Sequence, residues 1–121
     1  AWRQRHAGLR IVLVRGNHDR HAGDPPVALG IEVVEEPWVL APFALQHEPV
    51  AHPQHPVLAG HVHPVFVLQG RARQRLRLPC FLMDDRVSLL PAFGEFTGGW
   101  RVRGDATTRV FLAGAERVWA L

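Results

Sequence analysis

The sequence predicts a sheet-dominated α/β domain, because short apolar runs recur along its 121 residues and turn-forming residues separate them. The clearest helical pattern lies near the N-terminus. No apolar run approaches the roughly 20 residues that a membrane-spanning helix needs, so no membrane partner is expected. The length corresponds to one domain, and we expect residues 1–121 to form a single one.

The first half of the chain is expected to contain the end of a helix and several strands. Residues 2–10 mix apolar side chains with Arg and Gln and carry a glycine near their end, which predicts the close of a helix. Residues 11–14 are apolar and mainly β-branched, which indicates a buried strand that ends at a Gly16–Asn17 turn. Residues 21–29 contain two consecutive prolines and are expected to form a loop or a short helical turn. Further strands are expected at residues 31–34, 38–40, 43–46 and 57–59, with a loop at 50–56.

The second half is dominated by an alternating arginine segment. In residues 71–78 every second side chain is Arg, and the residues between them are Ala, Gln or Leu. Because side chains alternate between the two faces of a strand, this pattern predicts a strand with one charged face. That face would carry Arg71, Arg73, Arg75 and Arg77. Asp84–Asp85 predicts a hairpin turn, and residues 94–99 predict a glycine-rich loop. Further strands are expected at residues 65–68, 80–83, 87–90, 109–112 and 115–121.

Composition limits the classes of function. The formal charge is +3, all 14 basic residues are arginine, and the isoelectric point near 10.9 suits a phosphate-bearing partner. No signal peptide is visible in the polar, basic N-terminal stretch, and the single cysteine indicates a reducing compartment, so a cytoplasmic location is expected. We expect Cys80 to be a small buried side chain rather than a nucleophile. Since the chain opens at Ala1 and its only methionine is Met83, we expect a processed chain or a fragment.

Asn17, His18 and Asp19 follow the first predicted strand and carry groups that suit phosphate chemistry. An Asn oxygen can ligate a hard divalent metal, and a His can give a proton to a leaving-group oxygen. An adjacent Asp can hold that imidazole in one tautomer. On its own, however, the segment is more typical of a polar turn.

His61 and His63 form a second metal-capable segment after another apolar run. In extended backbone, residues i and i+2 point to the same side, so we expect the two imidazoles to face one point and to ligate one ion or two adjacent ions. His47, at the end of another predicted strand, is a third candidate ligand for a borderline metal. No ligand role is expected for the remaining histidines, which are His6, His21, His52 and His55.

Three motifs occur in a specific order: Gly16-Asn17-His18-Asp19-Arg20, then His47-Glu48-Pro49, then Gly60-His61-Val62-His63-Pro64. This order resembles the last three motifs of the calcineurin-like metallophosphoesterases. With residues 78–81 and 90–99 included, the chain is most similar to the ligase-associated DNA damage response endonucleases of the PdeM type, over about residues 1–100. The resemblance implies a four-layer αββα sandwich, of which this chain would be the strand-rich C-terminal part.

The resemblance also implies residue roles. His18 would stabilise charge or donate a proton at the scissile phosphate, and Asp19 would orient the His18 imidazole. Arg20 would contact phosphate or brace the loop. The expected cofactor is a divalent metal, Mn²⁺. Its ligands would be Asn17, His47 and His61 at one ion and His63 at the other.

Two motifs of that family, an Asp-x-His and a Gly-Asp, should precede Asn17, and neither occurs in the residues before it. They supply the carboxylate that bridges the two metals, and neither Asp24 nor Asp84–Asp85 is placed to replace it. We therefore expect at most one bound ion, because His63 alone will not hold the second. The isolated chain is expected to be a weak or inactive catalyst and to self-associate through the strand edges that the missing segment would cover.

The leading interpretation is therefore metal-dependent hydrolysis of phosphodiesters in DNA repair. One alternative is another substrate, such as a small phosphodiester, a lipid pyrophosphate or a phosphoprotein. The other is a non-catalytic fragment that binds nucleic acid or protein through its arginine face, whose DNA binding would survive a chelator and His61→Ala. The arginine face itself fits a DNA track and a solvated strand equally well. The resemblance implies an ATP-dependent DNA ligase, a helicase and an exonuclease-like protein as partners.

Overall fold

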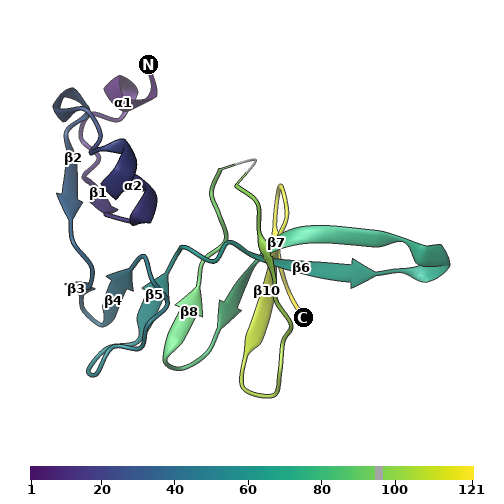
Figure 1. The fold of residues 1–121 in the computed structure, drawn as a ribbon. Coiled ribbons are helices and arrows are strands. Elements are labelled where there is room, and N and C mark those ends of the chain that lie inside the picture. The colour runs from purple at the N-terminus through teal and green to yellow at the C-terminus, as the bar shows by residue number, and fades with distance from the viewer. Residues whose placement is uncertain (95–96) are drawn as a thin grey trace.

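The chain has a mixed α/β architecture made mostly of short strands, as the computed structural model shows for residues 1–94 and 97–121 (Figure 1). The helices α1 (Trp2–Arg5) and α2 (Asn17–Ala22) are only one or two turns long. Two 3₁₀ turns, η1 (Val27–Leu29) and η2 (Arg71–Arg73), complete the helical content of the described residues. None of the described helices is long and apolar enough to span a membrane.

A small parallel sheet forms at the N-terminal end. Strands β1 (Ile11–Val14) and β2 (Ile31–Val34) pair in parallel, with Ile11 opposite Ile31. The segment between them contains α2 and η1, as a parallel crossover requires. Figure 1 shows this unit near β3 and β4, at the opposite end of the molecule from the tip of the β6–β7 hairpin.

The larger sheet has nine strands and mixed direction. Its main path runs in the order β11-β10-β7-β8-β5-β4-β3, while β6 pairs with β7 and β9 pairs with β6. The pairs β4–β5 and β5–β8 are parallel, and the pairs β7–β8 and β7–β10 are antiparallel. Its strands are β3 (Trp38–Leu40), β4 (Phe43–Gln46), β5 (Val57–Ala59), β6 (Pro64–Gln69), β7 (Arg75–Met83), β8 (Val87–Leu89), β9 (Trp100–Arg101), β10 (Arg109–Ala113) and β11 (Val118–Ala120).

Two small clusters form the buried core. One surrounds Cys80, which is fully buried as predicted, and burial raises the pKa of its thiol to about 11. The other centres on Val57 and lies between β4 and β8. The members of the first cluster are Cys80, Val102, Val110 and Leu112, and those of the second are Ala44, Val57 and Ala59.

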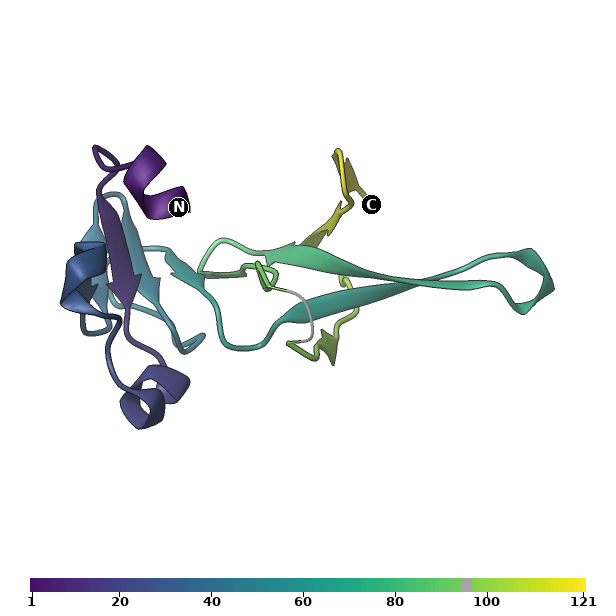
Figure 2. The same cartoon turned by 90° about the horizontal axis from the view of Figure 1, so that it is seen from above.

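Strands β6 and β7 extend beyond the sheet as a two-stranded arm (Figures 1 and 2). Their pairing runs from Val65 opposite Pro79 to Gln69 opposite Arg75. The prediction of a strand over residues 71–78 is therefore wrong in its first half. Residues 71–73 form η2 at the tip, because the chain must reverse there for β7 to pair with β6.

Most of the other predicted strands are confirmed, and the structure adds β9, which was not predicted. Residues 80–83 continue β7 instead of forming a separate strand. The predicted turn at Gly16–Asn17 is instead the start of helix α2. Within the loop expected at 94–99, Glu95 and Phe96 lie outside the described residues.

Candidate metal centre

Three strand ends bring the candidate ligands together. Helix α2 begins two residues after β1 and carries Asn17 in its first position. Strands β4 and β5 are parallel neighbours, with Gln46 opposite Ala59. Because their carboxyl ends meet at one edge of the sheet, His47 and His61, which follow these ends, become neighbours as well.

The ligand atoms are a few ångström apart. His47 Nε2 lies 2.7 Å from His61 Nδ1 and 2.7 Å from Asn17 Oδ1. The two imidazole rings meet edge to face, with an interplanar angle of 70° and 4.6 Å between their centroids. Glu48 Oε1 lies 3.7 Å from His61 Nε2. Of the predicted ligands, the structure therefore brings Asn17, His47 and His61 into one group, and it adds Glu48.

This group of atoms fits a divalent cation. A neutral imidazole nitrogen is either a donor or an acceptor, yet His47 Nε2 has two polar neighbours at 2.7 Å. Ligands about 2.1 Å from a shared ion lie about 3 Å from one another at right angles, which is close to the spacing seen here. Imidazole suits borderline metals, and amide or carboxylate oxygen suits harder ones.

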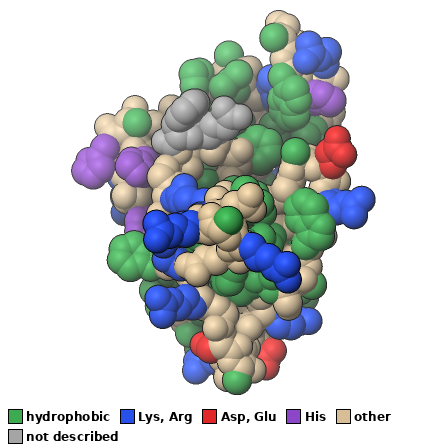
Figure 3. Space-filling view, turned by 90° about the vertical axis from the view of Figure 1, so that its right-hand side faces the viewer, with side chains coloured by type: hydrophobic (Ala, Val, Ile, Leu, Met, Phe, Trp, Pro, Cys, Tyr) green, Lys and Arg blue, Asp and Glu red, His purple; other side chains and the backbone are tan. Residues whose placement is uncertain are grey.

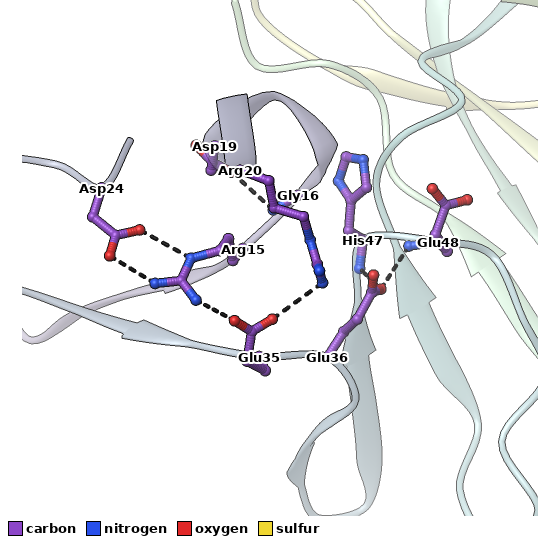
Figure 4. A network of polar contacts seen from close by, with 9 residues as sticks. All are labelled: Arg15, Gly16, Asp19, Arg20, Asp24, Glu35, Glu36, His47 and Glu48. Atoms are coloured by element: carbon purple, nitrogen blue, oxygen red, sulfur yellow. Dashed lines mark hydrogen bonds and ion pairs between the residues drawn. The ribbon is translucent and has the colours of Figure 1, made fainter. Parts of the chain in front are cut away.

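Glu36 holds the backbone of this ligand segment. Its Oε2 accepts hydrogen bonds from the N–H groups of His47 and Glu48, at 2.7 and 2.8 Å (Figure 4). Both bonds end on the same oxygen, so one side chain fixes two consecutive residues that carry ligand atoms. Glu36 was not predicted as a site residue. In the sequence, its signal is its place two residues after the strand predicted at residues 31–34.

Gly16 makes room for His47. An added Cβ at Gly16 would lie 2.6 Å from His47 Nδ1, far inside ordinary contact. The buried glycine therefore lets the imidazole lie against the turn that carries Asn17. Steric contact with His47 therefore explains why this position is glycine, and the sequence alone does not reveal that contact.

The electrostatic surroundings keep His47 uncharged. Burial lowers its pKa below the usual 6.5, and the neighbouring His61 lowers it further, while nearby carboxylates oppose the shift. The neutral ring is the form that ligates metals. His47 therefore has its ligand form available at neutral pH.

His61 and His63 do not have the predicted extended geometry. Both lie in the left-handed region, with φ of 55° and 52°, so the expectation that they face one point is wrong. His61 contacts His47, whereas His63 Nδ1 lies 2.9 Å from the carbonyl oxygen of Thr97. Left-handed backbone costs about 1–2 kcal/mol per non-glycine residue, and such residues are concentrated at functional sites.

The contact of His63 nevertheless suits a ligand. Because a carbonyl oxygen can only accept, the proton must be on Nδ1, which leaves the lone pair on Nε2. Metal-binding histidines commonly have their other nitrogen held in this way. Its place in a second site stays a prediction.

Helix α2 presents the remaining predicted residues. His18 is exposed on its first turn. The carboxylate of Asp19 accepts a hydrogen bond from the N–H of Gly16 at 2.8 Å and so caps the helix, while its role toward His18 stays a prediction. Arg20 Nη2 lies 3.2 Å from Glu35 Oε2, in an exposed ion pair that braces α2 against the end of β2 (Figure 4).

Arg15 strengthens the same connection. It pairs with Asp24 at 2.6 Å and with Glu35, so it links three segments below the site (Figure 4). The hydrogen bonds from Arg15, and then its positive charge, lower the pKa of Asp24. The predicted phosphate-binding arginines lie elsewhere, on the arm: Arg75 and Arg77 on β7, and Arg71 and Arg73 in the tip.

Comparison with known proteins finds similarity to a solved structure. No protein-family model matches the sequence, and no curated protein matches it. Among solved structures, the chain is similar to Pseudomonas putida nuclease MPE, with 68% sequence identity and a TM-score of 0.87. The match covers 99% of this chain and 58% of that protein's chain. The chain therefore resembles, over nearly all of its length, somewhat more than half of a nuclease of known structure.

Proposed function

We propose that this chain carries part of the active site of a metal-dependent nuclease that hydrolyses phosphodiester bonds in DNA. The observation that supports this most is the convergence of Asn17, His47 and His61, from three separate segments, on atoms 2.7 Å apart. The similarity to a solved nuclease at 68% identity supports the reaction class.

The finer assignment follows the order of the motifs. The chain would be a calcineurin-like metallophosphoesterase of the ligase-associated type, and its sheets would form part of a four-layer αββα sandwich. Since it spans 58% of the solved nuclease, the complete site would draw on further residues. The ligase, helicase and exonuclease-like partners stay predictions from the resemblance.

The proposed residue roles come from the motifs, and the geometry supports some of them. Asn17, His47 and His61 would hold one divalent ion, with Glu48 beside them as a further oxygen ligand. His63, with its proton held on Nδ1, would offer Nε2 to a second ion. When bound, a divalent ion supplies positive charge that polarises a phosphoryl oxygen.

His18 would complete the reaction at the leaving group. Hydrolysis adds water across a P–O bond, so the departing alkoxide oxygen needs a proton. His18 is exposed on the turn that presents Asn17, where its imidazole can donate that proton. Arg20, in an exposed ion pair with Glu35, is placed on the same helix to contact phosphate.

Calorimetric titration with Mn²⁺ tests the proposal. We expect one ion per chain, and we expect Asn17→Ala, His47→Ala and His61→Ala each to weaken its binding at least tenfold. His21→Ala is the matched control, because His21 is exposed on the same helix and is not among the candidate ligands. Equal affinity in all four variants would contradict the assignment.

A second measurement tests the reaction. The chain extended by the region that the solved relative has in addition should cleave a DNA duplex when Mn²⁺ is present and not when a chelator is added. A panel of a DNA duplex, a small phosphodiester and a phosphopeptide would identify the substrate class. Cleavage of the phosphopeptide alone would contradict the nuclease assignment.

A further inference from the structure

The arm formed by β6, η2 and β7 concentrates the positive charge of the molecule. Residues 65–79 contain four arginines and no acidic residue, which gives this segment a charge of +4. The chain as a whole carries +3, so the rest of the chain has a net charge of −1. The positive net charge of the chain therefore comes from this one projecting hairpin, because the rest of the chain is almost neutral.

The two faces of the arm differ. Along β7, Arg75 and Arg77 share one face, while Leu78 lies on the other and packs against the core cluster around Cys80. The segment from Arg71 to Arg77 is exposed throughout. Leu78 therefore anchors β7 to the core at the root of the arm, and the arginine face is left to solvent.

The tip adds two more arginines. The N–H of Gly70 donates to the carbonyl of Gln74 at 2.9 Å and closes the reversal. Within it, Ala72 and Arg73 lie in the left-handed region, with φ of 55° and 62°. Backbone of this kind is maintained at a cost and is found at ligand clamps. The turn carries Arg71 and Arg73 to the far end of the arm.

These arginines are not neutralised within the described part of the chain. The arginine ion pairs there involve Arg10, Arg15 and Arg20, all of which belong to the N-terminal unit. Figure 3 faces the side toward which the arm points and shows blue side chains gathered around its centre, with red ones near the edges. Among the described residues, no acidic side chain pairs with the arginines of the arm.

The root of the arm leads to the candidate metal centre. Arg77 Nη2 donates to the carbonyl of Gly99 at 3.2 Å. Arg77 and His63 both line a cavity of about 670 Å³ between the arm and the loop before β9. A polyanion that lies along the arm is therefore directed toward the segment that carries His61 and His63.

We propose that the arm is a backbone-binding element that holds the sugar-phosphate chain of a DNA duplex and guides it toward the metal centre. A row of guanidinium groups matches a row of phosphates, and each guanidinium can bind phosphate oxygens with two hydrogen bonds. From Pro79 to Arg75 the strand covers about 14 Å, at about 3.4 Å per residue. This proposal rests on the proposed nuclease function for its choice of partner.

The test measures binding to a labelled DNA duplex across a range of salt, with a chelator present so that no hydrolysis occurs. The arm variant is Arg71→Gln, Arg73→Gln and Arg75→Gln. The matched control is Arg5→Gln, Arg86→Gln and Arg103→Gln, which removes three exposed arginines outside the arm. Both triple variants lower the formal charge from +3 to 0, so they differ only in position.

Three lost phosphate contacts should reduce the slope of log affinity against log salt by about 2.7, at about 0.9 per contact. Between 50 and 200 mM salt, the affinity of the unaltered chain should then fall about 40-fold more than that of the arm variant. The control variant should keep most of the original slope. Replacing the same three arm residues by Lys should also keep it, because the charge remains.

Two results would overturn the proposal. Equal slopes in the arm and control variants would mean that net charge alone drives binding. Unchanged DNA binding together with weakened binding of the arm variant to phosphatidylserine vesicles would mean that the arm serves a lipid surface. These binding measurements are made without metal. A negative result therefore concerns the arm alone and can be told apart from a failure of metal-dependent cleavage.

Discussion

At the scale of single residues, the candidate centre depends on positions whose importance is steric. His47 lies against Gly16 so closely that no other residue fits there without moving the ring. The same ring has Asn17 and His61 as its polar neighbours. A larger side chain at Gly16 would therefore move His47 away from Asn17 and His61.

Gly16→Ala should weaken Mn²⁺ binding at least tenfold, because the new methyl group requires His47 to leave its position 2.6 Å away. Calorimetric titration checks this. Gly8→Ala is the control, since an added Cβ at Gly8 has nothing within 4 Å. An unchanged affinity in Gly16→Ala would mean that the ring can relax without loss of the site.

The lowered pKa of His47 predicts a dependence of stability on pH in the absence of metal. The unfolded chain binds a proton at about 6.5, whereas the folded chain binds it only at lower pH. Between these values the unfolded state holds more protons, so the free energy of unfolding should fall as pH drops below 6.5. This contribution to the free energy of unfolding is fully present above pH 6.5.

Urea unfolding at pH 7.5 and pH 5.5, with a chelator present, measures this effect. The unaltered chain should lose more stability than His47→Gln, because glutamine does not titrate. A loss of the same size in both proteins would show that other groups cause the acid sensitivity.

At the scale of elements, the site is held by segments that follow strand ends. Parallel pairing of β4 and β5 sets His47 beside His61, and the carboxylate of Glu36, just after β2, fixes the backbone at His47 and Glu48. Ion pairs of Arg15 and Arg20 with Glu35 tie α2 and the residues just before it to the end of β2. The two neighbouring residues Glu35 and Glu36 thus hold the segments that carry Asn17 and His47.

Glu36→Gln should bind Mn²⁺ almost as well as the unaltered chain, whereas Glu36→Ala should bind it about tenfold less tightly. Both hydrogen bonds end on one oxygen, and the amide oxygen of Gln can accept both. Titration of both variants, with thermal unfolding to check the fold, separates the two roles. Equal losses in Gln and Ala would show that the charge, not the positioning, is what matters.

The sequence predicted most strands and the grouping of Asn17, His47 and His61. It could not reveal the left-handed backbone at His61 and His63, because non-glycine residues seldom adopt it and tertiary contacts decide where they do. Strict alternation suggested one long strand over residues 71–78, but the pairing of β6 with β7 required a reversal at 71–73. Glu48 and Glu36 were missed because carboxylates near strand ends are common.

At the scale of the whole molecule, the buried core of the described residues is small. Its two clusters contain few large side chains, and several large apolar residues are exposed, among them Trp100 at 71%. A chain with so little buried apolar surface has modest stability. A ligand that binds only the folded state should therefore have a visible effect.

Mn²⁺ at 100 times its dissociation constant should stabilise the folded chain by about 2.7 kcal/mol, which corresponds to a rise in Tm of several degrees. His61→Ala should abolish the rise, and His21→Ala should keep it. Thermal unfolding with Mn²⁺ and with a chelator checks this prediction. A rise of the same size in His61→Ala would place the stabilising ion elsewhere.

The distribution of charge also belongs to this scale. The arm carries the positive charge at one end of the molecule, and the candidate ligands lie toward the other, beside the β1–β2 unit (Figure 1). A long polyanion can contact both, whereas a small phosphodiester would reach only the ligands. The arrangement therefore favours DNA over a small substrate.

The most direct test is the position of a bound ion in crystals grown with Mn²⁺, located by anomalous scattering at the manganese edge. The account predicts a peak within bonding distance of Asn17 Oδ1, His47 Nε2 and a ring nitrogen of His61, at about 2.0–2.2 Å from each. A peak that is bound by other residues, or none near these three at saturating Mn²⁺, would contradict it.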